Sequence, residues 1–210
     1  DIHFWRFLPE VVYAIRAKGK NPHIFTYTVI DSPVHYLDVL NLVVVDVCGV
    51  PSQYGIDEIL KIDLGIKHKL LHVPHGIDTK EFYPLSEKEI KQTRLDKFQC
   101  NNGEFLIANI NRNSARKDIT RTLMYFGILK PYWPKAKLYL HMQKNEEGVK
   151  GYDLDRILDC NSKWLLDISM PAGFNADKGM GVKNLNLIYN CADLIISTTK
   201  GEGFGLSTIE

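Results

Sequence analysis

The chain has 210 residues, of which 45% are hydrophobic and 24% are charged, and this composition excludes disordered, collagen-like and low-complexity classes. The 26 basic and 25 acidic side chains nearly cancel, so no overall charge draws the protein to nucleic acid, and any anion site has to be local. The longest apolar stretch, residues 39–50, is far shorter than the ~20 residues that a membrane helix needs.

The four cysteines, Cys48, Cys100, Cys160 and Cys191, are widely separated in the sequence. They form neither a CxxC pair nor a Cys/His cluster with the spacing of metal ligands. We therefore interpret them as reduced packing residues, which is typical of a cytoplasmic protein, and we expect no metal site. No signal peptide is visible at the start of the sequence.

Short β-rich runs alternate with amphipathic helical stretches, and this pattern predicts an α/β fold with mainly parallel sheets. In the first part of the chain we expect strands at 23–30, 41–50 and 70–74. Ser52 is a favourable N-cap for a helix that continues to about Leu64. The polar segment 79–103 is predicted to be a linker or crossing between a first domain, 1–78, and a second, 104–210.

The second domain restarts the alternation with a predicted strand at 105–110 and a helix from about Asp118. Further elements are expected in the following order: a strand at 136–141, a helix at 153–160, a strand at 164–168, a Gly-rich loop at 169–181, a helix at 183–191 and a strand at 193–197. The last predicted helix is interrupted at residue 210, so we expect a sequence that is incomplete at both ends.

Two glutamates, Glu202 and Glu210, flank a Gly-rich strand-to-helix turn near the end of the chain. Glycines at 201, 203 and 205 allow the backbone to approach a ligand closely, and such turns bind ligands at the carboxyl ends of parallel strands. The helix that follows offers free N–H groups to an anion. Because carboxylates repel phosphate, we assign the glutamates to hydroxyl groups of a sugar or ribose. The alternative is a Gly-rich turn with coincidental acidic neighbours.

A basic loop lies at a second strand-to-helix junction, residues 109–118. Arg112 and Lys117 are five positions apart and can converge on one diphosphate, the first as a planar fork and the second as a mobile point charge. Such a pair would neutralise a leaving group. The alternative is a solvated basic loop in which Asp118 is a simple N-cap.

Four segments occur in the order and at the intervals seen in family-4 retaining glycosyltransferases. They are Val73 to Asp78, Asn111 to Asp118, Leu185 to Asp193 and Glu202 to Glu210. The chain resembles this family from about residue 23 to its end. The resemblance implies the GT-B architecture, two Rossmann-like domains with parallel sheets, of which 1–78 would belong to the acceptor-side domain and 104–210 to the donor-binding domain. It also implies sugar transfer from a nucleoside-diphosphate sugar, with retention of anomeric configuration and without a metal or other cofactor.

The resemblance further implies roles for individual residues. Arg112 and Lys117 would bind the donor diphosphate, and Glu202 would contact hydroxyls of the transferred sugar. Glu210 would hold the ribose. The remaining donor-binding positions would be Gly203, Phe204, Gly205 and Leu206. Retention in this family is attributed to same-face attack assisted by the leaving phosphate, so electrostatic stabilisation is the main contribution of the protein.

The sequence departs from the family pattern in its first domain. Relatives carry a Gly-rich donor loop near their start and a histidine at the cleft edge, and neither has a counterpart here. Asp31 occupies the matching neighbourhood, either as a sugar contact or as a turn residue. His75 is expected to shape the crossing between domains, and His141 to be a packed strand residue.

Other readings of the sequence stay open. The chain could be a non-catalytic nucleotide-sugar-binding module, or another enzyme of GT-B type such as a phosphorylase or a sugar-nucleotide epimerase. The expected partners are a UDP- or GDP-sugar and an acceptor that is a glycan, a lipid or a small molecule. We expect no nucleic acid, and membrane association is left open.

Overall fold

The computed structural model describes residues 7–62, 64–145, 150–160, 167–175 and 178–210. The chain forms two compact units, one made of residues 1–76 with 201–206 and the other of residues 77–200 with 207–210. Within the described residues, none of the helices combines the length and the apolar character needed to cross a membrane.

The first unit contains a sheet of three parallel strands in the order β1-β2-β3, counted over its described residues. The strands are β1 (Phe25–Tyr27), β2 (Val47–Val50) and β3 (Leu70–His72). The helices are α1 (Leu8–Ala17), α2 (Tyr36–Leu40) and α3 (Gln53–Leu60), with 3-10 turns η2 (Asn41–Val44) and η3 (Lys67–Lys69). Buried side chains from one face of the sheet, among them Cys48 and Val50, pack against the helices and form one core.

The prediction of a continuous strand at 41–50 is wrong in its first half. Asn41–Val44 is a 3-10 turn that continues from α2, and only Val47–Val50 is a strand. Leu42 and Val45 are nevertheless fully buried in the core. An apolar run indicates burial, but its periodicity does not distinguish a short buried helical turn from a buried strand.

Ser52 caps α3 as predicted, because its hydroxyl oxygen accepts a hydrogen bond from the backbone N–H of Gly55 at 3.2 Å. The helix is shorter than expected and ends at Leu60. An added Cβ at Gly55 would lie 2.7 Å from Cγ1 of Val50, so this glycine allows α3 to approach β2 closely. The strand predicted at 23–30 is also shorter, since only Phe25–Tyr27 is paired as a strand.

The second unit contains a sheet of four parallel strands in the order β6-β5-β4-β7, again counted over the described residues. They are β4 (Phe105–Ile110), β5 (Ala136–His141), β6 (Ile168–Ser169) and β7 (Leu194–Ile195). The helices are α4 (Glu87–Phe98), α5 (Ile119–Leu129), α6 (Leu154–Cys160), α7 (Val182–Cys191) and α8 (Leu206–Ile209). Strands β4 and β5 have the predicted bounds. The first part of the strand predicted at 164–168 lies outside the described residues.

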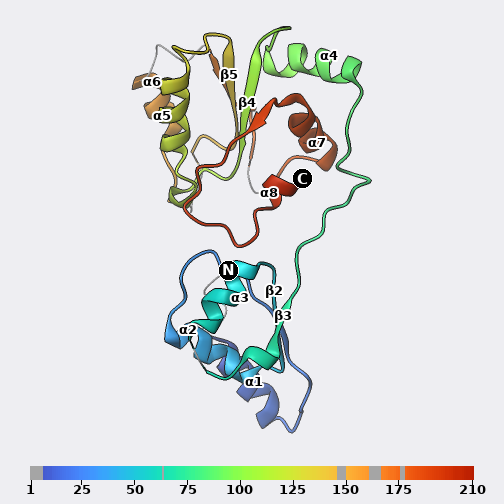
Figure 1. Ribbon diagram of the computed structural model, residues 1–210, viewed down its shortest axis with the longest axis vertical. Coiled ribbons are helices and arrows are strands. Elements are labelled where there is room, and N and C mark those ends of the chain that lie inside the picture. The colour runs from blue at the N-terminus through green and yellow to red at the C-terminus, as the bar shows by residue number, and fades with distance from the viewer. Residues whose placement is uncertain (1–6, 63, 146–149, 161–166, 176–177) are drawn as a thin grey trace. The chain divides into compact units, whose positions relative to one another are not determined.

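Helices cover both faces of this sheet. Figure 1 shows α5 and α6 on one side of β4 and β5, and α4 and α7 on the other. Alternate residues of β4 supply both cores, with Leu106 and Ala108 facing α4 and α7 while Ile107 faces α5 and α6. The helix predicted from about Asp118 is α5, and its residues Ile119 and Phe126 are buried in the second of these cores.

About half of the segment predicted as a linker, 79–103, is helical in the structure, because it contains the 12 residues of α4. Ser86 caps this helix by accepting a hydrogen bond from the N–H of Glu89. Arg94 donates hydrogen bonds to the carbonyl oxygens of Cys191, at 2.7 Å, and Glu104, at 2.7 Å, and pairs with Asp193 at 2.9 Å. This guanidinium ties α4 to the amino ends of β4 and β7.

Three of the cysteines are free and buried, namely Cys48, Cys100 and Cys191. Burial raises the pKa of the Cys191 thiol to about 11, which keeps it protonated and unreactive near neutral pH. These three are packing residues, as the sequence predicts. The side chain of Cys160 lies outside the part of the chain that can be described.

Candidate functional site

The two loops that carry the predicted site residues begin at neighbouring strands. β4 pairs with β7 in parallel, with Ile107 opposite Leu194 and Ala108 opposite Ile195. The carboxyl ends of both strands therefore lie at the same edge of the sheet, where open α/β sheets bind ligands.

The basic loop follows β4 and leads directly into α5. Arg112 is exposed, whereas Lys117 is half-buried at the end of the 3-10 turn η4 (Ala115–Lys117). The next residue, Asp118, has φ 49° and ψ 51°, a left-handed conformation that costs a residue other than glycine about 1 kcal/mol or more. This backbone conformation ends the turn and starts the helix in a new direction.

Asp118 stands at the N-cap position of α5 but makes no side-chain cap to the helix. Its carboxylate instead accepts a hydrogen bond from the Thr120 hydroxyl at 3.1 Å and pairs with Nε of Arg121 at 3.2 Å. The carboxylate is 10% exposed. It therefore holds the first turn of α5 together through side chains rather than as the simple N-cap that the sequence suggests.

Asn113 anchors the basic loop from the β5 side. Its side chain is fully buried, and its amide nitrogen donates to the carbonyl oxygens of Lys144 and Tyr152, both at 2.7 Å. Its amide oxygen accepts from the N–H of Tyr152 at 3.0 Å. Gly151 lies so close to the Asn113 carbonyl oxygen that a Cβ there would collide with it. Close backbone packing thus fixes the middle of the loop.

Residues after β7 anchor the other end of the same loop. The backbone N–H of Lys200 donates to the carbonyl oxygen of Arg116 at 2.9 Å. The hydroxyl of Thr198 donates to the carbonyl oxygens of Lys117, at 3.1 Å, and Asp118, at 2.9 Å. The loop that carries Arg112 and Lys117 is therefore held on both sides before any ligand arrives, which lowers the entropy cost of binding.

A small hollow lies between the carboxyl ends of β4 and β7 and the start of α8. Its volume is about 300 Å³. The lining residues are Ile110, Asn111, Ile195, Ile196, Ser197, Ser207 and Thr208. Amide and hydroxyl groups of Asn111, Ser197 and Ser207 can hydrogen bond to a polar ligand there.

The segment from Glu202 to Glu210, called the acidic segment below, follows β7 and is divided between the two units. Gly201–Leu206 is grouped with the first unit, and Ser207–Glu210 with the second. Gly205 has φ 84°, so glycine is required at this turn. Within the first unit, the Phe204 ring contacts the ring of His75 edge to face, with centroids 5.0 Å apart. The assignment of Glu202, Gly203, Phe204, Gly205 and Leu206 to the donor stays a prediction.

Glu210 accepts a hydrogen bond from the hydroxyl of Tyr189 at 2.8 Å. Tyr189 lies on α7, and its pKa is raised by burial first and by the bond to the Glu210 carboxylate second. The hydroxyl therefore stays protonated and remains a donor to Glu210. This contact fixes the side chain that the sequence assigns to the ribose, and the ribose assignment itself stays a prediction.

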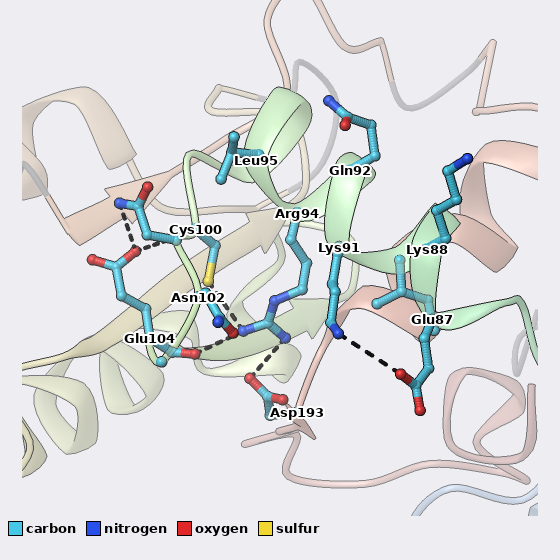
Figure 2. A pocket seen from close by; sticks show the side chains of 13 residues that line it. Glu87, Lys88, Lys91, Gln92, Arg94, Leu95, Cys100, Asn102, Glu104 and Asp193 are labelled. Carbon is cyan, nitrogen blue, oxygen red and sulfur yellow. Dashed lines mark hydrogen bonds and ion pairs between the residues drawn. The ribbon is translucent and has the colours of Figure 1, made fainter.

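A second cavity lies at the opposite, amino end of the strands. Figure 2 shows it between α4 and the segment before β4, where the Arg94 guanidinium points toward Asp193, Cys100 and Glu104. Its volume is about 960 Å³. Because parallel sheets bind ligands at their carboxyl ends, and Arg94 already has carbonyl and carboxylate partners, we assign this cavity to the scaffold.

Of the two histidines singled out in the sequence, His141 is buried and His75 is half-buried. His141, the last residue of β5, is 6% exposed and lies 3.4 Å from the hydroxyl of Tyr139. Burial lowers the pKa of its imidazole, so the ring is neutral in the folded chain near pH 7. His75 lies in the first unit, where Nδ1 is 3.1 Å from the Tyr27 hydroxyl. His141 is thus a packed strand residue, as predicted.

Sequence reasoning overlooked three residues at the predicted site, Asn109, Thr122 and Thr198. The side-chain amide of Asn109 donates to the Thr122 hydroxyl at 2.8 Å, and this hydroxyl is 2.7 Å from that of Thr198. The polar Asn109 inside the apolar run of β4 was the one available signal, because a fully buried amide needs partners.

Comparisons with known proteins find sequence and structural similarity to sugar-transferring enzymes. No family model matches the sequence. A mannosylfructose-phosphate synthase from Agrobacterium fabrum is 28% identical over 159 residues, which cover 73% of this chain and 33% of that protein. The structure of HepE from Anabaena in complex with UDP matches 93% of this chain and 51% of its own, with a TM-score of 0.67 and 16% identity. An α,α-trehalose-phosphate synthase (UDP-forming) from Burkholderia vietnamiensis matches 98% and 51%, with a TM-score of 0.69 and 12% identity.

The chain spans about a third of the curated relative and about half of these solved structures. The likeness to the solved structures extends over both units and confirms the predicted fold class. The relatives are glycosyltransferases, which confirms the resemblance that the four motifs carry. The chain therefore has an α/β fold of the GT-B type, and the proteins that it resembles in sequence and structure are glycosyltransferases.

Proposed function

We propose that the chain binds a nucleoside-diphosphate sugar and takes part in the transfer of its sugar to an acceptor, with retention of anomeric configuration. The observation that carries the proposal is the anchored basic loop at the end of β4, beside the end of β7. HepE was solved with UDP and with UDP-glucose, and this supports a UDP-sugar as the donor. A synthase that makes mannosylfructose phosphate supports a hydroxyl-bearing acceptor such as a sugar phosphate.

In this proposal, Arg112 and Lys117 bind the two phosphates of the donor. Charge accumulates on the β-phosphate as the glycosidic bond breaks, and two cations held in place beforehand stabilise it without reorganisation. An Arg presents two parallel N–H groups to phosphate oxygens, and a Lys adds a compact charge. The fixed backbone of the loop, held by Asn113 and Thr198, keeps both side chains at one end of the sheet.

The acidic segment binds the rest of the donor. Glu202 accepts hydrogen bonds from hydroxyls of the transferred sugar, and Glu210 accepts them from the ribose. Retention follows if the acceptor attacks from the face that the leaving phosphate occupies, with that phosphate taking the acceptor proton. No protein nucleophile is then needed.

Calorimetry with UDP, GDP and UDP-glucose, followed by a transfer assay with sugar phosphates, tests the proposal. We expect UDP to bind the 210-residue chain. Binding without transfer would favour a non-catalytic nucleotide-sugar-binding module. Phosphate-dependent sugar release would indicate a phosphorylase, and a product epimeric with the donor would indicate an epimerase.

Arg112→Ala is expected to lower transfer by about 10²- to 10³-fold, because one preorganised contact to the developing charge is lost. Arg116→Ala is the matched control, since Arg116 is an exposed arginine of the same loop. Circular dichroism should show both variants folded. Near-full activity of Arg112→Ala, or an equal loss in both variants, would contradict the assignment of Arg112 to the diphosphate.

We also propose that the transfer needs no metal, because the two basic side chains supply the charge that a divalent cation would otherwise supply. Addition of EDTA is then expected to leave the rate unchanged. A rate that falls with EDTA and recovers with Mg²⁺ or Mn²⁺ would contradict this part of the proposal.

A further inference from the structure

A chain of hydrogen bonds runs beneath the basic loop. The side-chain amide of Asn109 donates to the Thr122 hydroxyl at 2.8 Å, and the oxygens of Thr122 and Thr198 are 2.7 Å apart. The Thr198 hydroxyl lies 2.9 Å from the carbonyl oxygen of Asp118 and 3.1 Å from that of Lys117. The chain thus begins in the middle of the sheet and ends on the peptide groups of the loop.

The direction of these hydrogen bonds follows from counting protons. Each hydroxyl has one proton to donate. Asn109 and Thr122 are 0% and 1% exposed, so water does not compete for them. If Thr122 donates to Thr198, the proton of the Thr198 hydroxyl remains available for the carbonyl oxygens of the loop. The side chains of this hydrogen-bonded series then all have partners. The reverse direction would leave those carbonyl oxygens without this donor.

The peptide groups that Thr198 holds are those that determine where the Lys117 side chain begins. Asp118 has a left-handed backbone with φ 49°, which is unfavourable for a residue other than glycine and persists only when its surroundings enforce it. The Thr198 hydroxyl contacts the carbonyl oxygens on both sides of this strained residue's N–H, at Lys117 and at Asp118 itself. We therefore expect that removal of the hydroxyl loosens the backbone at Lys117.

We propose that Thr198 is a positioning residue for the donor diphosphate, acting through the backbone of Lys117 rather than by touching the ligand. The inference rests on the proposed function, since it assigns Lys117 to the phosphates. Thr198 follows β7 and so links the strand end that leads to the acidic segment with the loop that carries the cations. Thr122 and Asn109 orient its proton from below.

Two substitutions distinguish the effect of the Thr198 hydroxyl on UDP binding from the effect of the side-chain shape. Thr198→Val keeps the branched shape and removes the hydroxyl, whereas Thr198→Ser keeps the hydroxyl. We expect Thr198→Val to weaken UDP binding about tenfold, the usual size of the loss when a buried hydrogen-bonding group loses its partner. The affinity for uridine, which has no phosphates, should not change. Thr198→Ser should bind UDP nearly as well as the unmodified chain.

A comparison in the Lys117→Ala variant distinguishes positioning of Lys117 from a general structural role of Thr198. If Thr198 acts through Lys117, then Thr198→Val adds almost no further loss of UDP affinity once the amine is gone. An undiminished tenfold loss in that background, or an equal loss of uridine affinity, would overturn the proposal.

Hydrogen exchange in the ligand-free chain distinguishes failure of this proposal from failure of the proposed function. The N–H groups of Lys117 and Asp118 donate to Ser114 and Ala115 inside the turn, and we expect them to exchange faster in Thr198→Val than in Thr198→Ser. Equal exchange in both variants would overturn the positioning role whatever the chain binds. Faster exchange in Thr198→Val, with no UDP binding by the unmodified chain, would refute the proposed function and leave the hydroxyl as the group that holds the loop.

Discussion

The two units have parallel sheets that differ in how their faces are covered. In the second unit, core residues of β4 and β5 lie on both faces, and helices pack on each. In the first unit, one face contributes to the core, while Phe25, Tyr27 and Leu71 on the other are 57%, 39% and 52% exposed. Strand register places these three side chains on one face around Gly49.

The comparison shows where a rigid site can be built. Parallel strands are normally buried on both faces, so a sheet with two cores holds its strand ends more firmly than a sheet with one. The loop of Arg112 and Lys117 begins at β4, in the middle of the better-covered sheet. We therefore expect the second unit to be the more stable and to keep the basic loop fixed without the first.

The largest expected effect is a loss of stability, and it differs between a leucine in the core of the second unit and a leucine on the exposed face of the first sheet. Leu138 in β5 is completely buried, so Leu138→Ala should lower the free energy of unfolding by about 3 kcal/mol, through lost apolar burial and the cavity left behind. Leu71→Ala is the matched control, because Leu71 lies in β3 but is 52% exposed, and it should cost less than about 1 kcal/mol. Urea denaturation followed by fluorescence measures both. Similar losses would show that the two sheets are covered alike.

A smaller effect tests whether the units unfold separately. Ser52 and Ser86 make the same N-cap, each accepting from a backbone N–H three residues later, at 3.2 and 3.3 Å. Ser52→Ala and Ser86→Ala should each cost about 1 kcal/mol. With hydrogen exchange as the probe, we expect the first to increase exchange in α3 and the second in α4. Increased exchange in both helices from either substitution would mean that the units unfold as one.

The smallest expected effect is a pH dependence that belongs to the second unit. Burial lowers the pKa of His141 in the folded chain, whereas in the unfolded chain it is about 6.5. The unfolded chain then binds the proton more readily, so the stabilisation is present above pH ~6.5 and is lost as the pH falls below it. His141→Phe should reduce this loss.

His72→Phe is the control for the pH experiment, because His72 also ends a strand but is exposed. Unfolding free energies at pH 7.5 and 5.5 provide the comparison. If His72→Phe reduces the loss at low pH as much as His141→Phe does, the dependence does not come from the buried imidazole.

The elements that matched their predicted bounds are those with the simplest physical signals. β4 and β5 are predominantly apolar runs that are buried on both faces. Each follows a turn residue, Gly103 before β4 and Pro134 before β5, and this pattern favours a strand. The prediction for 41–50 failed because Leu42 reaches the core from a 3-10 turn, and Val45 from the extended residue that follows this turn, as well as they would from a strand. The sequence predicted burial in both cases, but it did not predict the backbone conformation that brings the side chains into the core.

The order and spacing of the four motifs were enough to determine the fold class and the resemblance to glycosyltransferases, because both depend on local residue types along the chain. The hydrogen bond from Thr198 to the Lys117 carbonyl oxygen could not be predicted in this way. The two residues are 81 positions apart and meet only because β4 and β7 pair. The left-handed backbone of Asp118 was equally hidden, because aspartate does not require it. Such conformations arise where tertiary hydrogen bonds outweigh local preference, and only the folded chain reveals them.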